Sequence, residues 1–454
     1  MMTHISLNHF KSWRRITNER LAAITGLFGT NSSGKTSILQ WLLLLKQTVE
    51  SSDRHQVLEF GDERSLVELG TFNDVVFDHE KPGTISWAFS WQLPGALPMR
   101  YPEYADSEFC WEGDKLSFSC EVAEGSTKQL YVTRMAYDFS GQRMEYAYKE
   151  TQGKYELQVR AAGDFAPKRR RGRPAELPPP IKFYGFPDQA VNSFENLGFL
   201  PDFQLQLEEL FGRIFHLGPL REPPQREYTW AGAQPSDMGR RGERVIHAIL
   251  ASRERGERIS RGKGKPKWTL EQYVAHWLKE LQLIEDFQVR PVAAGSSLYQ
   301  VRVQRHKDST PVLLTDVGFG VSQILPVITL CYYVPTGSTL LLEQPEIHLH
   351  PSVQAGLADV FIDAIKTRDL QIILESHSEH LLRRLQRRIA EEQLATDRTA
   401  FYFCEMPDDV SRLVPLELDE YGNIKNWPKD FFGDEMGEMA AMTRAQMERM
   451  RAPA

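Results

Sequence analysis

The chain of 454 residues is 41% hydrophobic and 25% charged, with a formal net charge of −7 at pH 7, which is typical of a globular protein with a large core. This acidic balance excludes a surface that is basic all over, so binding of nucleic acid would depend on local patches. The apolar run at residues 41–45 is too short to cross a membrane, and the four cysteines show no C-x-x-C spacing. We therefore expect a cytoplasmic protein of two or three domains, without a membrane segment, a zinc site or a disulfide framework.

The first 80 residues predict a strand–loop–helix unit. Residues 5–10 alternate apolar and polar side chains, and residues 21–28 form a more apolar stretch, so both predict short strands. Residues 29–36 form a loop bounded by glycines, and residues 37–49 predict a strongly apolar helix.

The next two regions differ sharply in composition. Residues 81–165 carry strand-like segments at 84–91, 115–122, 129–137 and 155–160, separated by turn residues. They predict a β-rich arm inserted into the first domain. Residues 166–182 are rich in arginine and proline and predict a poorly ordered basic linker.

The remaining chain predicts helices and then a return to α/β character. Residues 183–310 form a helical and mixed subdomain, with amphipathic helices expected at 205–215 and 269–283. Residues 311–400 contain apolar strands at 338–342 and 370–374, and residues 401–454 form a C-terminal tail. No internal repeat and no long heptad run is present in the sequence.

The glycine-bounded loop matches the phosphate-binding pattern G-x-x-x-x-G-K-[ST]. The glycines let consecutive backbone N–H groups face a phosphate, Lys35 reaches the β- and γ-phosphates, and the Thr36 hydroxyl ligates Mg²⁺. The strand before this loop and the helix after it are the context that it requires. The sequence therefore predicts ATP and Mg²⁺ as cofactors, bound by Gly29, Thr30, Asn31, Ser32, Ser33, Gly34, Lys35, Thr36 and Ser37.

The apolar strand at residues 338–342 ends in Glu343, as in a Walker B motif. Such a strand places its carboxylate beside the phosphate-binding loop, where Glu343 can hold Mg²⁺ or a water bound to it. The alternative is a core strand that ends in an acid by chance, and the loop favours the functional interpretation. The separation of 308 residues (343 − 35) indicates an ATPase whose two halves are divided by an insertion.

Two further motifs point to phosphate. Gly318 and Gly320, with Ser322 close by, precede an apolar helix expected at 324–331, and glycines at a helix N-terminus form an anion-binding nest. An ordinary glycine turn is the alternative. His377 follows the strand at 370–374, and this position favours a γ-phosphate sensor over a histidine of the surface or core.

These motifs, in this order, resemble ABC-type ATPase heads of the SMC/RecF/OLD (overcoming lysogenization defect) class. More narrowly, the chain is similar to stand-alone prokaryotic AAA ATPases of anti-phage defence systems. The resemblance implies an α/β fold, an ABC-type P-loop ATPase head with a β-rich inserted arm and a helical subdomain. It also implies that Gly318 contacts the ATP of a partner head, so that a homo-oligomer closes head to head across ATP. The segments that carry it are HFKSW, SSGKTSILQWLLLLKQTV, VELGTFNDVVFDHE, HLGPLREPPQREYTW, VGFGVSQILP, LLLEQPEIHLHP, ESHSEHLL and NWPKDFF.

The sequence departs from that family at the residue after Glu343, where a catalytic glutamate is usual. Gln344 stands there, and glutamine can position a water but cannot accept its proton. Two alternatives follow: Glu346 or another residue acts as the base, or hydrolysis is slow and the ATP-bound state persists. The predicted catalytic residues are Lys35, Glu343, Gln344, Glu346 and His377.

Two functions remain in competition. The first is a slowly hydrolysing, nucleotide-dependent sensor that controls a separate effector such as a nuclease or toxin, an idea that comes from the resemblance. The second is a DNA-binding ATPase of repair or maintenance, favoured by the basic run at residues 168–173, whose Arg-Gly-Arg-Pro core resembles a minor-groove hook. A solvated linker is the plain alternative for that run. Its candidate DNA contacts are Arg169, Arg170, Arg171 and Arg173.

Overall fold

The computed structural model describes residues 1–79, 83–99, 111–160, 167–171, 176–262, 264–428, 431 and 435–451. Its centre is a six-stranded sheet in the order β17-β16-β3-β15-β14-β9. Neighbouring strands are parallel except β17, which runs antiparallel to β16. The bounds are β3 (Ile24–Gly29), β9 (Ile214–Leu217), β14 (Thr339–Glu343), β15 (Gln371–Glu375), β16 (Thr399–Glu405) and β17 (Arg412–Pro415). The predicted α/β class is confirmed.

The central sheet is buried on both faces, as parallel sheets usually are. Along β14, Leu341 packs into one hydrophobic core while Leu340 and Leu342 pack into the other. Helices α1 (Lys35–Glu50) and α4 (Leu200–Gly212) contribute to the first core. The second core takes residues from α5 (Val245–Glu254), α6 (Leu270–Glu280), α7 (Phe319–Tyr333), α8 (Pro351–Arg368) and α9 (Glu379–Ala390).

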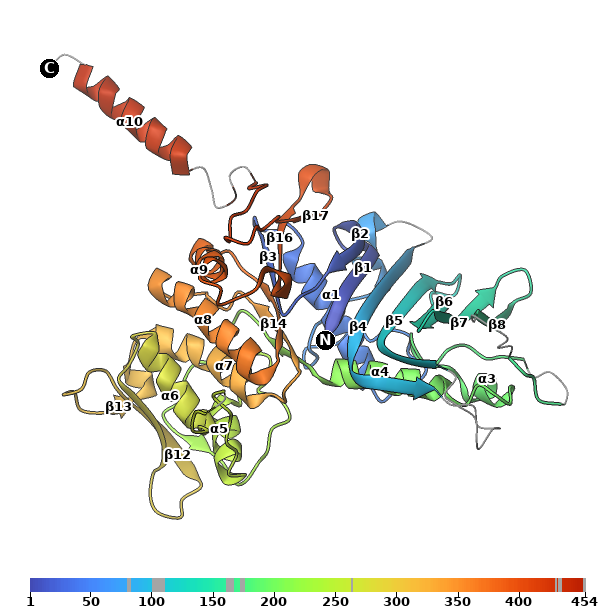
Figure 1. Ribbon diagram of the computed structural model, residues 1–454, viewed down its shortest axis with the longest axis horizontal. Coiled ribbons are helices and arrows are strands. Elements are labelled where there is room, and N and C mark those ends of the chain that lie inside the picture. Colours follow the sequence, from blue (N-terminus) through green and yellow to red (C-terminus); the bar gives the residue numbers. More distant parts are fainter. Residues whose placement is uncertain are drawn as a thin grey trace.

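A second sheet of seven antiparallel strands covers the side of the molecule opposite α5 to α9 (Figure 1). Its order is β2-β1-β4-β5-β6-β7-β8. The strands are β1 (Met2–Phe10), β2 (Trp13–Arg20), β4 (Thr84–Met99), β5 (Trp111–Glu124), β6 (Leu130–Phe139), β7 (Gln142–Lys149) and β8 (Lys154–Arg160).

The strands that the sequence predicts as an inserted β-rich arm at residues 81–165 are β4 to β8 of this sheet. The strands of that region continue the N-terminal sheet, because β4 pairs with β1, with Ser6 opposite Ala88. The physical reason is burial of every second side chain: Phe89 packs against Phe211 of α4, and their ring centroids are 5.5 Å apart. The sheet therefore shares the first core with α1 and is part of the same body.

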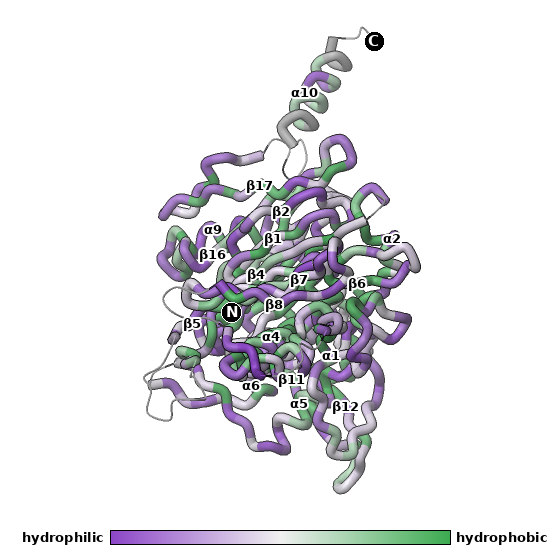
Figure 2. The backbone as a smooth tube through the Cα atoms, turned by 90° about the vertical axis from the view of Figure 1, so that its right-hand side faces the viewer, coloured by the Kyte–Doolittle hydropathy of each residue, from purple (hydrophilic) through white to green (hydrophobic). Residues whose placement is uncertain are grey.

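A small third sheet joins β10 (Tyr228–Thr229), β12 (Leu298–Gln304) and β11 (Asp286–Pro291), with β13 (Val312–Leu313) beside β12. Two short helices are α2 (Phe72–Val75) and α3 (Asp188–Asn192), and α10 (Glu435–Arg451) extends away from the rest of the chain (Figure 1). Hydrophilic residues follow the outer loops, while hydrophobic residues gather where the elements pack (Figure 2). Within the ranges given above, no helix has the length and apolar character needed to span a bilayer.

Candidate functional site

The loop between β3 and α1 is shaped by two glycines that the fold itself requires. Gly29 has a φ of +139°, and a Cβ atom there would lie 2.1 Å from the Cys404 carbonyl oxygen of β16. Gly34 has a φ of +89°, and its Cβ would lie 2.5 Å from Ser411 Oγ. Any other residue at either position would combine a strained backbone with a collision. The loop is therefore a close-fitting backbone cradle, the form that a bound phosphate needs.

Lys35 begins α1 and is only 4% exposed. Its Nζ donates hydrogen bonds to the carbonyl oxygens of Gly29 (3.2 Å) and Thr30 (2.6 Å). Burial lowers the pKa of Lys35, and the acidic groups around it, Glu375 and Glu346 among them, act in the opposite direction. The ammonium group thus lies across the loop, close to carboxylates from two other strands.

Glu375 ends β15 and contacts the residue predicted to bind magnesium. Thr36 Oγ1 donates a hydrogen bond of 2.7 Å to Glu375 Oε2. Burial raises the pKa of Glu375 to about 7, while this hydrogen bond opposes the rise. Glu375 is not among the residues that we predict from the sequence, although it ends an apolar strand in the same way as Glu343.

Glu343 ends β14 and is held from the neighbouring strand. His216 of β9 lies with its Nε2 2.7 Å from Glu343 Oε1, and the His216 side chain is 2% exposed. A buried hydrogen bond of this kind fixes the orientation of the carboxylate. His216 was also missed, because a single histidine in a short apolar segment gives no signal before the strand order is known.

Glu346 lies against the segment that carries the predicted sensor. Its Oε1 accepts hydrogen bonds from Ser376 Oγ (2.7 Å) and from the His377 backbone N–H (2.8 Å). Its Oε2 is buried without a hydrogen-bond partner among the described residues. Burial raises the pKa of Glu346, although these hydrogen bonds oppose the rise. Gln344 sits two residues earlier with a φ of +43°, where the chain turns sharply out of the strand.

His377 lies beside the phosphate-binding loop, as the sequence predicts for a sensor. Burial lowers the pKa of His377, the positive charge of Lys35 adds to this effect, and the backbone of Gly29 opposes it. The Ser376 backbone N–H donates a hydrogen bond of 3.0 Å to the Leu27 carbonyl oxygen of β3, so His377 directly follows a residue bonded to the strand that leads into the loop. The structure therefore gathers Lys35, Glu346 and His377 at one edge of the central sheet.

None of the hydrogen bonds given above joins the turn at Gly318 to Lys35, Glu346 or His377. Gly318 caps α7 at its N-terminus and is exposed, and Ser322 Oγ donates a hydrogen bond to the Phe319 carbonyl oxygen of the same helix. A Cβ at Gly318 would meet no atom within 4 Å, and one at Gly320 would approach Leu283 and Leu349 no closer than 3.9 Å. Neither packing nor backbone conformation within this chain requires a glycine at Gly318.

The basic run is only partly described, and Arg173 lies outside the described residues. Residues 167–171 form hydrogen bonds with residues 193–196. Arg170 N–H donates to the Ser193 carbonyl oxygen, and Arg169 lies over the ring of Phe194 with Cζ 5.6 Å from the centroid. The side chains of Lys168, Arg169, Arg170 and Arg171 are nevertheless exposed.

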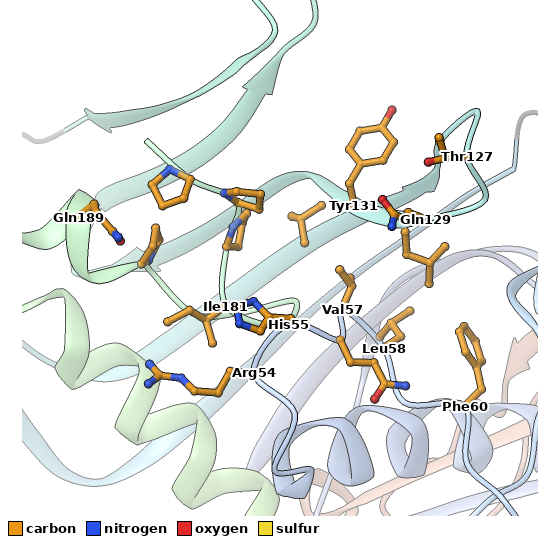
Figure 3. Close-up of a pocket in the computed structure, with 18 of the residues that line it drawn as sticks. Arg54, His55, Val57, Leu58, Phe60, Thr127, Gln129, Tyr131, Ile181 and Gln189 are labelled. Atoms are coloured by element: carbon orange, nitrogen blue, oxygen red, sulfur yellow. The ribbon is translucent and has the colours of Figure 1, made fainter. Parts of the chain in front are cut away.

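A cavity of about 950 Å³ lies apart from this constellation (Figure 3). Arg54, His55, Tyr131, Ile181 and Gln189 line it, together with neighbouring residues of the same segments. None of the residues that the sequence predicts to bind nucleotide belongs to its lining. The cavity therefore includes neither the phosphate-binding loop nor the carboxylates around it.

The residues present fit ATP and Mg²⁺. The cradle at Gly29 and Gly34 has no room for a side chain, and Thr36, Glu343 and Glu375 supply the oxygen donors that Mg²⁺ prefers. In the described part of the chain, no group of three or more His, Cys, Asp and Glu side chains forms a metal site of its own. Mg²⁺ at P-loop sites takes few protein ligands and completes its shell with water and phosphate oxygens.

Three solved structures are similar to this chain at low identity. One is the SMC head bound to the C-winged helix domain of ScpA, with 11% identity, coverage of 92% of this chain and 98% of that chain, and a TM-score of 0.47. The SMC head domain from Thermotoga maritima follows, with 11% identity, coverage of 92% and 99%, and a TM-score of 0.42. The Smc head with an extended coiled coil bound to the C-terminal domain of ScpA, from Pyrococcus furiosus, has 10% identity, coverage of 98% and 99%, and a TM-score of 0.43.

Two family models match the sequence, whereas a comparison with curated proteins gives no match. Residues 394–442 match a family described as a protein of unknown function. Residues 134–383 match a family described as "AAA domain, putative AbiEii toxin, Type IV TA system". That match includes Glu343 and His377, begins after the phosphate-binding loop and spans more than half of the 454 residues. The chain therefore belongs to this family of AAA-domain P-loop ATPases.

Proposed function

We propose that the chain binds ATP with Mg²⁺, hydrolyses it, and works as a nucleotide-dependent oligomeric regulator of a separate effector in anti-phage defence. The observation that carries the nucleotide part is the convergence of groups from four separate segments at one sheet edge. These groups are Lys35 and Thr36 after β3, Glu343 and Glu346 after β14, Glu375 and His377 after β15, and His216 on β9.

Each group has a role that follows from its surroundings. Backbone N–H groups of the loop and the Lys35 ammonium bind the phosphates, and bound Mg²⁺ would neutralise phosphate charge beside Thr36 and Glu343. Glu346 has one buried oxygen without a partner and a raised pKa, so it is our candidate for the base that takes a proton from the attacking water. His377 lies where the γ-phosphate would be sensed.

The exposed turn at Gly318 supports closure of two heads across ATP. Neither packing nor backbone conformation requires glycine at position 318. We infer that the backbone N–H groups of this turn face a ligand that another subunit brings. We propose that Gly318, Gly320 and Ser322 contact the ATP of the partner subunit. The defence role rests on the family description, which names a toxin and a toxin–antitoxin system, and on the resemblance of the motifs.

The assembly proposal makes a direct prediction. Gly320→Glu is expected to abolish ATP-induced self-association without unfolding the chain, because it brings a carboxylate against the partner's phosphates while its Cβ has room. Mass measurement with and without a slowly hydrolysed ATP analogue checks the result. Gly212→Glu is the matched control, since Gly212 is exposed and a Cβ there meets no atom within 4 Å, so the same change has room away from the proposed interface. An oligomer that forms equally without nucleotide, or in Gly320→Glu, would show that assembly uses another surface.

A DNA-binding role is the second candidate, favoured by the four exposed cations at residues 168–171. Here the expected result is weak binding of A·T-rich duplex that decreases steeply with salt and disappears when Arg169, Arg170 and Arg171 become alanine. Titration of a labelled duplex at several salt concentrations measures it. Replacing Arg258, Lys265 and Lys267 with alanine is the control, because it removes the same charge from a different loop. Equal loss of DNA affinity in both triple variants, or no binding at low salt, would show that the basic run is a solvated linker and not a DNA-binding segment.

A further inference from the structure

Arg221 is a buried cation whose donors have no partner. The residue is 5% exposed, and its Nε, Nη1 and Nη2 atoms all lack a hydrogen-bond partner among the described residues. Removing a guanidinium group from water without such partners is strongly unfavourable. A group in this state indicates that an anion belongs beside it.

The position of Arg221 connects it to the nucleotide site. It follows the end of β9 by four residues, and β9 is the strand next to β14, which carries Glu343. Burial lowers the pKa of Arg221 to about 10, and the carboxylates of Glu343 and Glu346 act in the opposite direction. Arg221 is therefore protonated at neutral pH. Leu217, the last residue of β9, pairs with Leu342, so the segment that carries Arg221 leaves the sheet at the edge where Glu343 ends β14.

One oxygen of each carboxylate already has a partner, and Glu346 Oε2 has none among the described residues. Glu343 Oε1 is bonded to His216, and Glu346 Oε1 is bonded to Ser376 and to the His377 backbone. Within the described residues, no ion pair within 4.0 Å joins Arg221 to either of them. A guanidinium offers five donors in a planar fork, which matches the oxygens of a phosphate group.

We propose that Arg221 binds the terminal phosphate of the nucleotide held in its own subunit, so that the site distinguishes ATP from ADP. The inference rests on the proposed function. Lys35 contacts the phosphates from the β3 side of the sheet edge, and Arg221 contacts the last of them from the β9 side. The triphosphate of the bound nucleotide supplies the anion that the buried guanidinium group lacks.

The test compares the affinities for ADP and for a slowly hydrolysed ATP analogue, both with Mg²⁺, in the full-length chain. Arg221→Gln is expected to weaken binding of the analogue by about 10- to 100-fold and to leave ADP affinity within about twofold, because only the triphosphate reaches the guanidinium. Arg221→Lys should recover part of the loss. Arg241→Gln is the matched control, since Arg241 is a half-exposed arginine paired with Glu222 near the same loop.

A second measurement separates ligand binding from a structural role. Without nucleotide, Arg221→Met is expected to melt no lower than the wild type, because it replaces an unpartnered buried charge with an apolar side chain of similar length. With the ATP analogue, its gain in melting temperature should be smaller than that of the wild type. A lower melting temperature without nucleotide would overturn the proposal, because Arg221 would then be stabilising the fold.

The outcomes also separate this inference from the function on which it rests. If the wild type binds neither ADP nor the analogue, the proposed function fails. If the wild type binds both and Arg221→Gln keeps the wild-type ratio of the two affinities, only the role of Arg221 is wrong. Equal weakening of both nucleotides would likewise contradict a contact with the terminal phosphate.

Discussion

Replacing Lys35 with alanine is expected to weaken ATP binding on the order of 100-fold and to abolish any activity that depends on it. A hydrogen bond to a charged group contributes about 1.5–3 kcal/mol, and about 1.4 kcal/mol corresponds to a factor of ten in affinity. The ammonium group lies 2.6 Å from the Thr30 carbonyl oxygen, so it is already placed at the mouth of the loop. Titration calorimetry with ATP and with ADP measures the loss.

The same variant should keep its fold, because Lys35 contacts the loop and contributes no apolar side chain to either core. Lys11→Ala is the control, since Lys11 is a half-buried lysine in the turn between β1 and β2, and its Nζ donates to Gln40 outside the site. Near-normal ATP affinity in Lys35→Ala would contradict the assignment of the loop. A melting temperature far below that of Lys11→Ala would attribute the loss to unfolding instead.

Replacing Glu346 with glutamine is expected to lower the rate of phosphate release by about 10²–10⁴-fold, which is the range that a general base contributes. The raised pKa of Glu346 and its unpartnered buried oxygen are the reasons. ATP affinity should change little, because the amide keeps the shape of the side chain and its Oε1 can still accept from Ser376. Steady-state phosphate release and nucleotide titration on the same preparation separate the two effects.

Gln344→Glu distinguishes the two explanations of the missing glutamate. If Glu346 is the base, the extra carboxylate should alter turnover little. If hydrolysis is slow because Gln344 cannot accept a proton, Gln344→Glu should raise turnover clearly and Glu346→Gln should have almost no effect. That second pattern would remove Glu346 from the catalytic residues, and wild-type turnover of many per second would contradict slow hydrolysis.

The sequence predicts the local parts of the site well. The loop at residues 29–36 and the strand that ends in Glu343 are each formed by residues that are neighbours in the chain. Their residue types and spacing therefore predict both the local structure and its chemistry. The structure places both at the same sheet edge, with His377 beside the loop. The α/β class follows from the same alternation of apolar strands and helices.

The parts that the sequence does not predict depend on which strands become neighbours. His216 lies 127 residues before Glu343, and Thr36 lies 339 residues before Glu375, yet each pair is joined by a hydrogen bond of 2.7 Å. Periodicity shows which face of a strand is buried but not which strand lies beside it. For the same reason, the sequence predicts an inserted arm of strands between Thr84 and Arg160 but does not predict that β4 pairs with β1.

The position of β3 between β15 and β16 affects how the chain folds during its synthesis. During synthesis, β3 and the apolar helix α1 leave the ribosome first, but both neighbours of β3 come from residues 371–405. The strand before the loop therefore has no edge to pair with until most of the polypeptide has been translated. Such distant pairing slows folding and leaves apolar segments exposed in the meantime. A nascent or truncated copy that ends before β15 lacks both neighbours of β3 and the Glu375 partner of Thr36, so the phosphate-binding loop has its full surroundings only in chains that extend through this region.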